Sequence, residues 1–152
     1  GKYHDVPMAD HARVIDANLI GHMNDAHAVL PIFLAQDRGT WVNMISVGGF
    51  FATPYAAAYA ASKAAVAHLG RNFAREWVRA GINVNTIQPG YIQTEINGDW
   101  FATEGGRAQI AGWHRRRLLP IDALDDMLTF FASDASAHVT GSVIDVDDGQ
   151  SL

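Results

Sequence analysis

Hydrophobic residues recur along the chain at two spacings, which divide it into long helical segments and short apolar runs. From Asp10 to Gln36 the apolar positions follow at intervals of three and four, which predicts a helix with Asp10 as its N-cap and bends at Gly21 and Pro31. A second helix is predicted from Tyr55 to Arg75, and Gly81 stands where a C-cap glycine belongs. Each helix leads into a short apolar run.

Three short runs with little charge predict strands at Trp41–Ser46, Ile82–Ile87 and Ser142–Val146. A third helix is predicted from Ile121 to Ser133, and the stretch from Tyr91 to Pro120 is predicted to be irregular, with a short helix around Thr103 to Gly112. The order α-β-α-β-α-β predicts parallel strands joined by right-handed crossovers, a small α/β layer structure. Without repeats or linker composition, residues 1–152 are expected to form one domain.

The candidate chemistry gathers at one edge of this sheet. Ligands of parallel α/β sheets bind beyond the carboxyl ends of the strands, where Ser46 and Pro89-Gly90 fall. Tyr59 and Lys63, four residues apart, share a face of the helix that follows Ser46. A nearby ammonium favours the phenolate form, which suits a general acid/base that exchanges a proton with an alcohol or a ketone. Singly, each of these residues also has an ordinary structural interpretation as a strand end, a turn or a solvated helix face.

The composition of the chain argues against several classes of partner and of chemistry. The net charge of −5 argues against a nucleic acid or an anionic membrane, and the absence of cysteine excludes disulfide and thiol chemistry. A cytoplasmic protein is expected. Arg115-Arg116-Arg117 is interpreted as a solvated turn before Pro120. No metal site is predicted, because His22 and His27, five apart, do not share a helical face and no His-Glu-x-x-His motif occurs.

Several motifs stand in a fixed order and spacing. Asn18-Leu-Ile-Gly21 comes first, Ser46 follows 28 positions after Asn18, and Tyr59-Ala-Ala-Ser-Lys63 begins thirteen positions after Ser46. The later segments are Ile82 to Thr94, Ser133 to Gly141 and Val146-Asp147-Asp148-Gly149. In these motifs the chain resembles the later half of a short-chain dehydrogenase/reductase, a family with a Rossmann-like three-layer fold, a parallel sheet with helices on both faces. Asp148 departs from the family pattern, which has glycine there.

The resemblance implies roles for individual residues. Tyr59 would be the acid/base, Lys63 would support it and bind the nicotinamide ribose, and Ser46 would orient the substrate oxygen. Asn18 would interrupt its helix so that a backbone carbonyl holds a water in the proton relay. A second group, with Tyr59 and Lys63, would line the cofactor, which is NAD or NADP: Pro89, Gly90, Ile92 and Thr94. The substrate would be a small secondary alcohol or ketone.

The resemblance also implies a substrate lid and an assembly. Tyr91 to Trp113 would form a mobile lid with glycines at 98, 105 and 106. A group of nearby aromatic side chains either favours an apolar or aromatic substrate or packs loops over the core: Phe50, Phe51, Tyr55, Tyr91, Trp100 and Phe101. The helices carrying Asn18 and Tyr59 would join subunits, so a homo-oligomer, a tetramer or a dimer, is expected.

The Gly-rich turn with which the family cradles the dinucleotide pyrophosphate does not occur in this sequence. The Asn-Asn-Ala-Gly strand that the family places next to Trp41–Ser46 is also absent from the sequence, so this strand is expected to be a bare sheet edge. Two functions stay open: an NAD(P)(H)-dependent oxidoreductase, and a catalytically inert half-domain that persists through self-association.

Overall fold

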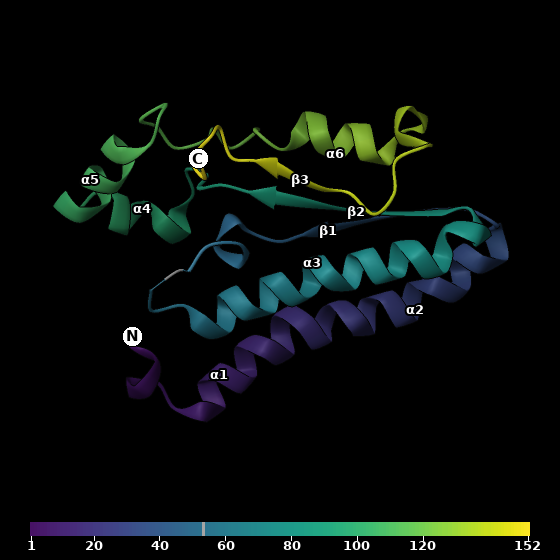
Figure 1. Cartoon of the computed structure of the whole chain (residues 1–152), viewed down its shortest axis with the longest axis horizontal. Coiled ribbons are helices and arrows are strands. Elements are labelled where there is room, and N and C mark those ends of the chain that lie inside the picture. Colours follow the sequence, from purple (N-terminus) through teal and green to yellow (C-terminus); the bar gives the residue numbers. More distant parts are fainter. Residues whose placement is uncertain (53) are drawn as a thin grey trace.

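The computed structural model describes residues 1–52 and 54–152, and consists of a small parallel sheet with helices on both faces (Figure 1). The helices are α1 (Met8–Ile15), α2 (Gly21–Gln36), α3 (Ala57–Trp77), α4 (Glu95–Phe101), α5 (Glu104–Gly112) and α6 (Asp125–Ala132). The strands are β1 (Gly39–Met44), β2 (Ile82–Pro89) and β3 (Val143–Val146). A π-helical segment, Asp16–Ile20, joins α1 to α2.

The sheet confirms the predicted α/β fold. Its strands run in the order β1-β2-β3 and both pairs are parallel, with Gly39 opposite Ile82 and Thr86 opposite Val143. β2 is the central strand, and all of its residues except Asn83 are buried. Within the described residues β1 pairs on one side only, so it forms an edge of the sheet.

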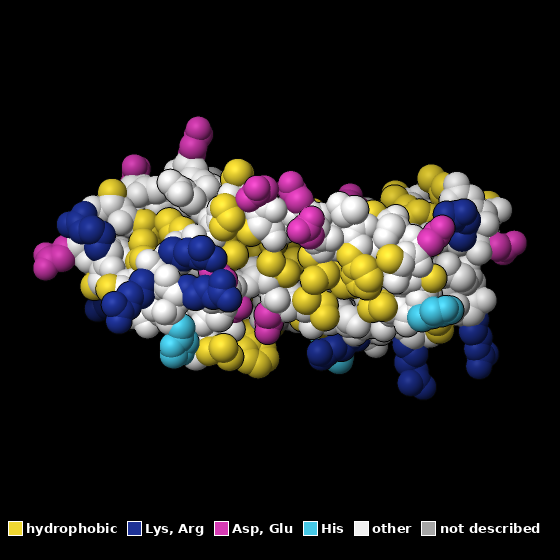
Figure 2. All heavy atoms as spheres, turned by 90° about the horizontal axis from the view of Figure 1, so that it is seen from above, with side chains coloured by type: hydrophobic (Ala, Val, Ile, Leu, Met, Phe, Trp, Pro, Cys, Tyr) yellow, Lys and Arg dark blue, Asp and Glu magenta, His cyan; other side chains and the backbone are white. Residues whose placement is uncertain are grey.

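The helices form a layer on each side of the sheet. Figure 1 shows α3 lying between the sheet and the long α1–α2 helix, with α6 on the opposite face. On the α6 side, Figure 2 shows hydrophobic side chains gathered along the stretch that α6 occupies, and Ile121, Leu128 and Phe130 are exposed there. No helix among the described residues is long and apolar enough to cross a bilayer.

The core lies between α3 and β2. Ile82, Val84 and Ile87 are fully buried, and Trp77 stacks on Phe73 with ring centroids 4.2 Å apart. Gly70 lets α3 approach the sheet, because a Cβ there would lie 2.5 Å from the Asn43 side-chain nitrogen. The close fit holds α3 at a fixed height above the carboxyl ends of β1 and β2.

The first helix is correctly predicted in extent but not in its details. Its N-cap is Pro7, so the prediction that Asp10 caps it is wrong; Asp10 lies in the first turn and pairs with Arg13. The irregularity falls before Gly21 and takes the form of the π-helix, in which the Gly21 N–H donates to the Asp16 carbonyl. Pro31 lies inside α2 without ending it.

Other predicted boundaries are wrong for local reasons. Tyr55 lies outside α3, because its φ of 67° is left-handed. β1 ends at Met44, because Ser46 caps a 3₁₀ turn and accepts a hydrogen bond from the Gly48 N–H. The stretch predicted to be irregular contains α4 as well as α5, because Thr94 and Asn97 form a capping box at the start of α4.

Candidate active site

Tyr59 and Lys63 lie on successive turns at the start of α3, above the carboxyl end of β1. The Lys63 Nζ lies 5.7 Å from the centroid of the Tyr59 ring. Tyr59 is exposed, at 38% of its full accessible area, so its phenol is open to a ligand. The structure therefore brings an ammonium and an accessible phenol together, as the helical spacing predicts.

Lys63 is anchored to the sheet through its side chain. Its Nζ donates to the carbonyl oxygen of Met44, the last residue of β1, at 3.2 Å. Partial burial lowers the pKa of Lys63 below its usual 10.5, because removing the ammonium from water disfavours its charged form. No sequence pattern signals this contact, since a backbone carbonyl carries no residue identity.

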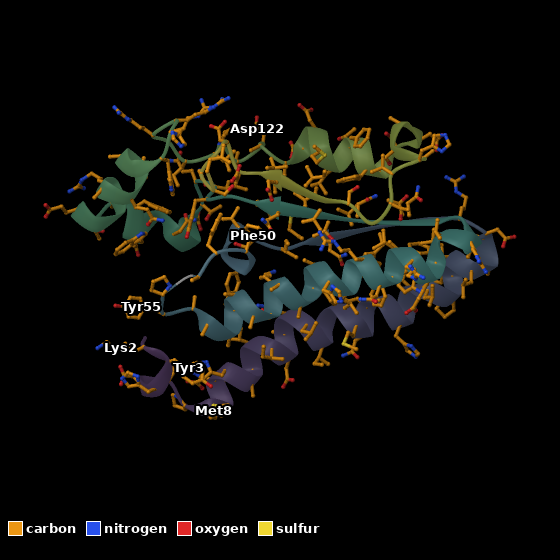
Figure 3. The ribbon with its side chains drawn as sticks, in the orientation of Figure 1. Lys2, Tyr3, Met8, Phe50, Tyr55 and Asp122 are labelled. Carbon is orange, nitrogen blue, oxygen red and sulfur yellow. The ribbon has the colours of Figure 1, made fainter. Side chains whose placement is uncertain are left out.

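The loop after Ser46 packs directly on the turn that carries Lys63. The Ser46 Oγ accepts a hydrogen bond from the Gly48 N–H at 3.1 Å, which leaves its own O–H able to donate. A Cβ on Gly49 would lie 2.9 Å from the Lys63 Cβ, so only glycine allows this approach. Phe50 and Tyr55, labelled in Figure 3, are exposed aromatic side chains between this loop and α3.

Asn18 reaches the same turn from the π-helix. Its Nδ2 donates to the Oγ of Ser62 at 3.0 Å, and that Oγ donates to the carbonyl oxygen of Tyr59 at 2.7 Å. Ser62 is fully buried. The sequence predicted that Asn18 interrupts its helix but assigned no role to Ser62, although a lone hydroxyl in an alanine-rich run was a signal that could have been used.

The second predicted group, Pro89 to Thr94, lies at the carboxyl end of β2. The Gly90 N–H donates to the Val146 carbonyl, and a Cβ on Gly90 would lie 2.8 Å from the Asp147 Cα, so glycine is required there by packing. Ile92 forms a bridge to Leu119, and Thr94 caps α4. Among the described residues, these contacts join the group to β3 and to the α4–α5 segment rather than to Tyr59 or Lys63.

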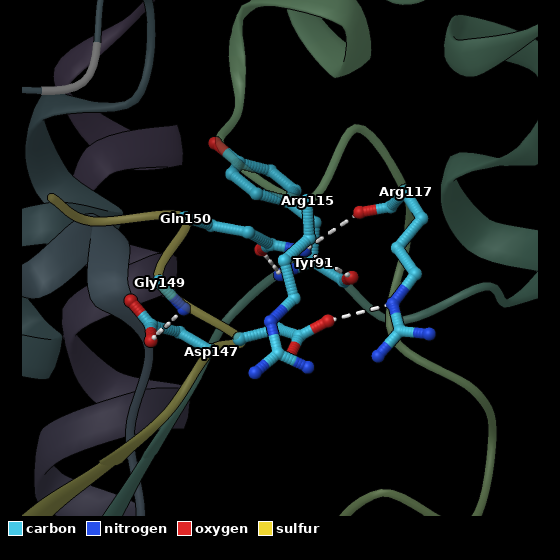
Figure 4. Close-up of polar contacts among 7 residues, drawn as sticks. Tyr91, Arg115, Arg117, Asp147, Gly149 and Gln150 are labelled. Atoms are coloured by element: carbon cyan, nitrogen blue, oxygen red, sulfur yellow. Dashed lines mark hydrogen bonds and ion pairs between the residues drawn. The ribbon is translucent and has the colours of Figure 1, made fainter.

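The turn after β3 forms a polar junction with the segment that follows α5 (Figure 4). Asp148 pairs with Arg115 at 2.9 Å and with Arg117 at 2.7 Å. The hydrogen bond from Arg117 and the charges of both arginines hold the pKa of Asp148 below its usual value. The basic cluster is thus not simply a solvated turn, since two of its three side chains have a carboxylate partner.

The side chain of Gln150 completes this junction. Its Oε1 accepts from the Tyr91 N–H at 2.6 Å, while its Nε2 donates to the Tyr91 carbonyl at 3.2 Å and to the Arg117 carbonyl at 3.3 Å. The turn after β3 therefore holds both ends of the α4–α5 segment.

An aromatic cluster holds the middle of that segment. Tyr91 stacks on Trp113 with centroids 5.3 Å apart, and Phe101 meets both rings edge-on. Phe101 is buried, so it packs inside the segment and does not face a substrate. Gly106 is also a packing residue, because a Cβ there would lie 2.5 Å from the Phe101 Cα. The segment is a folded unit, and its predicted role as a lid stays a prediction.

One surface hollow borders the site, and another lies away from it. One of about 300 Å³ borders Tyr59 and is lined by Val6, His11, Val14 and Tyr55. Another, polar and of about 230 Å³, lies at the amino-terminal end of the strands beside Arg38 and Ser133 and holds none of the predicted site residues. Among the described residues, no three His, Asp or Glu side chains are grouped as metal ligands.

A model of a protein family described as enoyl-(acyl carrier protein) reductase matches residues 1–151. An uncharacterized short-chain type dehydrogenase/reductase of Sinorhizobium fredii is 36% identical over 150 residues, covering 95% of this chain and 58% of the relative. A protein of Eggerthella lenta named 3beta-hydroxysteroid dehydrogenase 1 is 37% identical over 147 residues, covering 92% of this chain and 54% of the relative.

Solved structures show the same fold. A gluconate 5-dehydrogenase from Burkholderia cenocepacia, in complex with NADP and tartrate, superimposes with a TM-score of 0.94 at 31% identity. The match covers 99% of this chain and 59% of that one. The chain thus spans little more than half the length of the proteins it resembles.

Proposed function

Because the chain belongs to the short-chain dehydrogenase/reductase family, we propose that it forms part of an NAD(P)(H)-dependent oxidoreductase that interconverts a secondary alcohol and a ketone. The observation that carries this proposal is the pairing of an accessible Tyr59 phenol with the Lys63 ammonium, 5.7 Å from the ring centroid. The pair stands at the carboxyl edge of a parallel sheet, where such folds bind ligands.

The residues present fit the nicotinamide end of the cofactor. A lysine ammonium has three donors, of which the Met44 carbonyl takes one, so Lys63 can also donate to the ribose hydroxyls. The β2 end, with Pro89, Gly90, Ile92 and Thr94, provides the other side of this site. A bound nicotinamide supplies or accepts the hydride.

The chain's own residues move and hold the proton. During reduction, the Tyr59 Oη gives its proton to the carbonyl oxygen of the substrate, and during oxidation it takes the proton of the alcohol. The Lys63 charge stabilises the phenolate that reduction leaves behind. The Ser46 O–H donates to the substrate oxygen and so orients it towards Tyr59.

A homo-oligomer is part of the proposal. α2 and the π-helix expose four large apolar side chains, Ile20, Met23, Ile32 and Leu34, which support contact with another subunit. An apolar hollow of about 460 Å³ also lies between α1 and α3, beside Tyr3 and Met8. Sedimentation of the purified chain measures this association directly.

The proposed reaction is tested by titrating the chain with NADH and NADPH through nicotinamide fluorescence, and then by measuring turnover of secondary alcohols. Tyr59→Phe is expected to bind the cofactor normally and to lose about 10²–10⁴-fold in kcat, the usual contribution of a general acid/base. Tyr3→Phe is the matched control, since the Tyr3 hydroxyl donates to the sulfur of Met8 and lies away from Lys63 among the described residues. Unchanged turnover in Tyr59→Phe would overturn the assignment, and failure to bind either cofactor would favour the inert, self-associating half-domain.

A further inference from the structure

The first turn of α3 carries Tyr59, but no side chain caps the amino-terminal end of this helix. Its N-cap residue is Ala56, whose methyl group cannot accept a hydrogen bond from the open N–H groups of the first turn. Alanine at an N-cap leaves a helix end less stable than serine, threonine or aspartate would. Something other than a cap must hold this turn in place.

Hydrogen bonds through Ser62 hold this turn against the neighbouring π-helix. The Tyr59 carbonyl accepts the Ser62 hydroxyl at 2.7 Å, and in an α-helix the same carbonyl accepts the N–H of Lys63, four residues on. The Ser62 oxygen in turn accepts from the Asn18 Nδ2 at 3.0 Å. One buried hydroxyl therefore joins the backbone of both Tyr59 and Lys63 to a different helix.

The partner helix is shaped for this contact. Asn18 lies in the middle of the five-residue π-helix, whose wider turn differs from the α-helices before and after it. π-Helical turns are rare and occur often at functional sites. In the folded protein the wide turn places Asn18 against α3, where its side chain donates a hydrogen bond to Ser62.

We infer that Ser62 is a positioning residue for Tyr59: together with Asn18 it fixes the first turn of α3, and so the place of the phenol beside the Lys63 ammonium. The inference rests on the proposed function of Tyr59, but its geometric part can be measured without turnover. Ser62 touches neither the phenol oxygen nor a ligand site directly, so it acts through the backbone.

The test compares three variants. Ser62→Ala removes the bridging oxygen, and Ser62→Cys keeps the volume with a weaker donor. Ser136→Ala is the matched control: Ser136 is also buried, and its hydroxyl also donates to a backbone carbonyl, that of Phe131, at 3.0 Å. It lies in the turn after α6, away from Tyr59.

The first measurement is the NMR signal of the Tyr59 ring, identified by its loss in Tyr59→Phe, together with amide hydrogen exchange over residues 57–63. We expect Ser62→Ala to broaden or shift the ring signal and to speed exchange in this turn about tenfold or more, with Ser62→Cys intermediate. Ser136→Ala should leave both unchanged. If Ser62→Ala does not fold, Ser62→Cys carries the same comparison.

The second measurement is turnover. Ser62→Ala is expected to lower kcat about tenfold, with KM little changed, because misplacing the acid/base affects the proton step more than binding. A ring signal and exchange rates in Ser62→Ala equal to those of Ser136→Ala overturn the inference. Normal turnover in Tyr59→Phe would instead overturn the proposed function, and the ring signal would still report on Ser62.

Discussion

The helical side of the site, formed by α1, the π-helix and α3, differs from the α4–α5 segment in what holds it to the sheet. α3 packs on β1, β2 and the π-helix through fully buried contacts such as Val66 and Ser62. α4 and α5 pack mainly on each other and on the aromatic cluster inside their segment, and the polar junction at Asp148 and Gln150 ties this segment to the turn after β3. Tyr59, the proposed acid/base, thus lies on the part with the fully buried contacts, and we predict that the segment beside it opens more readily than the core.

The largest expected effect on this contrast comes from Phe101→Ala. Deleting a buried aromatic ring costs about 3–5 kcal/mol, and here the loss should be confined to the α4–α5 segment. Amide exchange over residues 95–112 should become much faster, while residues 57–77 keep their protection. Phe50→Ala is the control, because that ring is 77% exposed. Equal loss of protection in α3 would show that the two regions unfold together.

A smaller effect is expected from Lys63→Met. Burial lowers the pKa of Lys63 from 10.5, so the folded state disfavours the ammonium and wild-type stability should rise as the pH climbs through the lowered value towards 10.5. The Met variant lacks this rise, and the half-exposed position limits the difference to less than about 1 kcal/mol.

Urea unfolding of both proteins across a pH series measures this difference, with the exposed Lys2→Met as control. The stability of wild type relative to Lys63→Met should increase with pH. A relative stability that falls with rising pH would mean that the bond to the Met44 carbonyl outweighs the cost of burial.

The smallest effect is expected from Asp148→Asn. Asparagine accepts the left-handed φ of 57° found at Asp148, so the change removes the charge without straining the backbone. The pairing with Arg117 and Arg115 lowers the pKa of Asp148, so its stabilising contribution is present above the unfolded pKa and is lost as the pH falls through the lowered value.

Because salt screens exposed ion pairs, exchange over residues 113–119 should depend on salt in wild type and not in Asp148→Asn. Asp122→Asn, at an exposed carboxylate outside the junction, should behave as wild type. If the salt dependence persists in Asp148→Asn, the ion pairs of Asp148 do not hold this segment in place.

The sequence predicted what periodicity and helical spacing encode. The parallel α/β layers, the α3 helix and the meeting of Tyr59 with Lys63 follow from the hydrophobic pattern and from the four-residue interval. It failed where a backbone group or a distant partner decides the geometry. The Met44 carbonyl, the cap of α4 by Thr94 and Asn97, and the pairing of Arg117 with Asp148, 31 residues on, carry no local pattern.

The π-helical turn at Asp16–Ile20 also bears on how a deletion within the first helix would act. A π turn holds one residue more than the α turn it replaces, and each residue of an α-helix advances it by about 100°. Deleting a single codon here would let α1 and α2 merge into one regular cylinder. α1 would keep nearly the same face towards α3, because a π turn and an α turn both complete one circle, but the wider turn that carries Asn18 would be lost. The extra residue of this turn therefore shapes the backbone around Asn18 without changing which face of α1 meets α3.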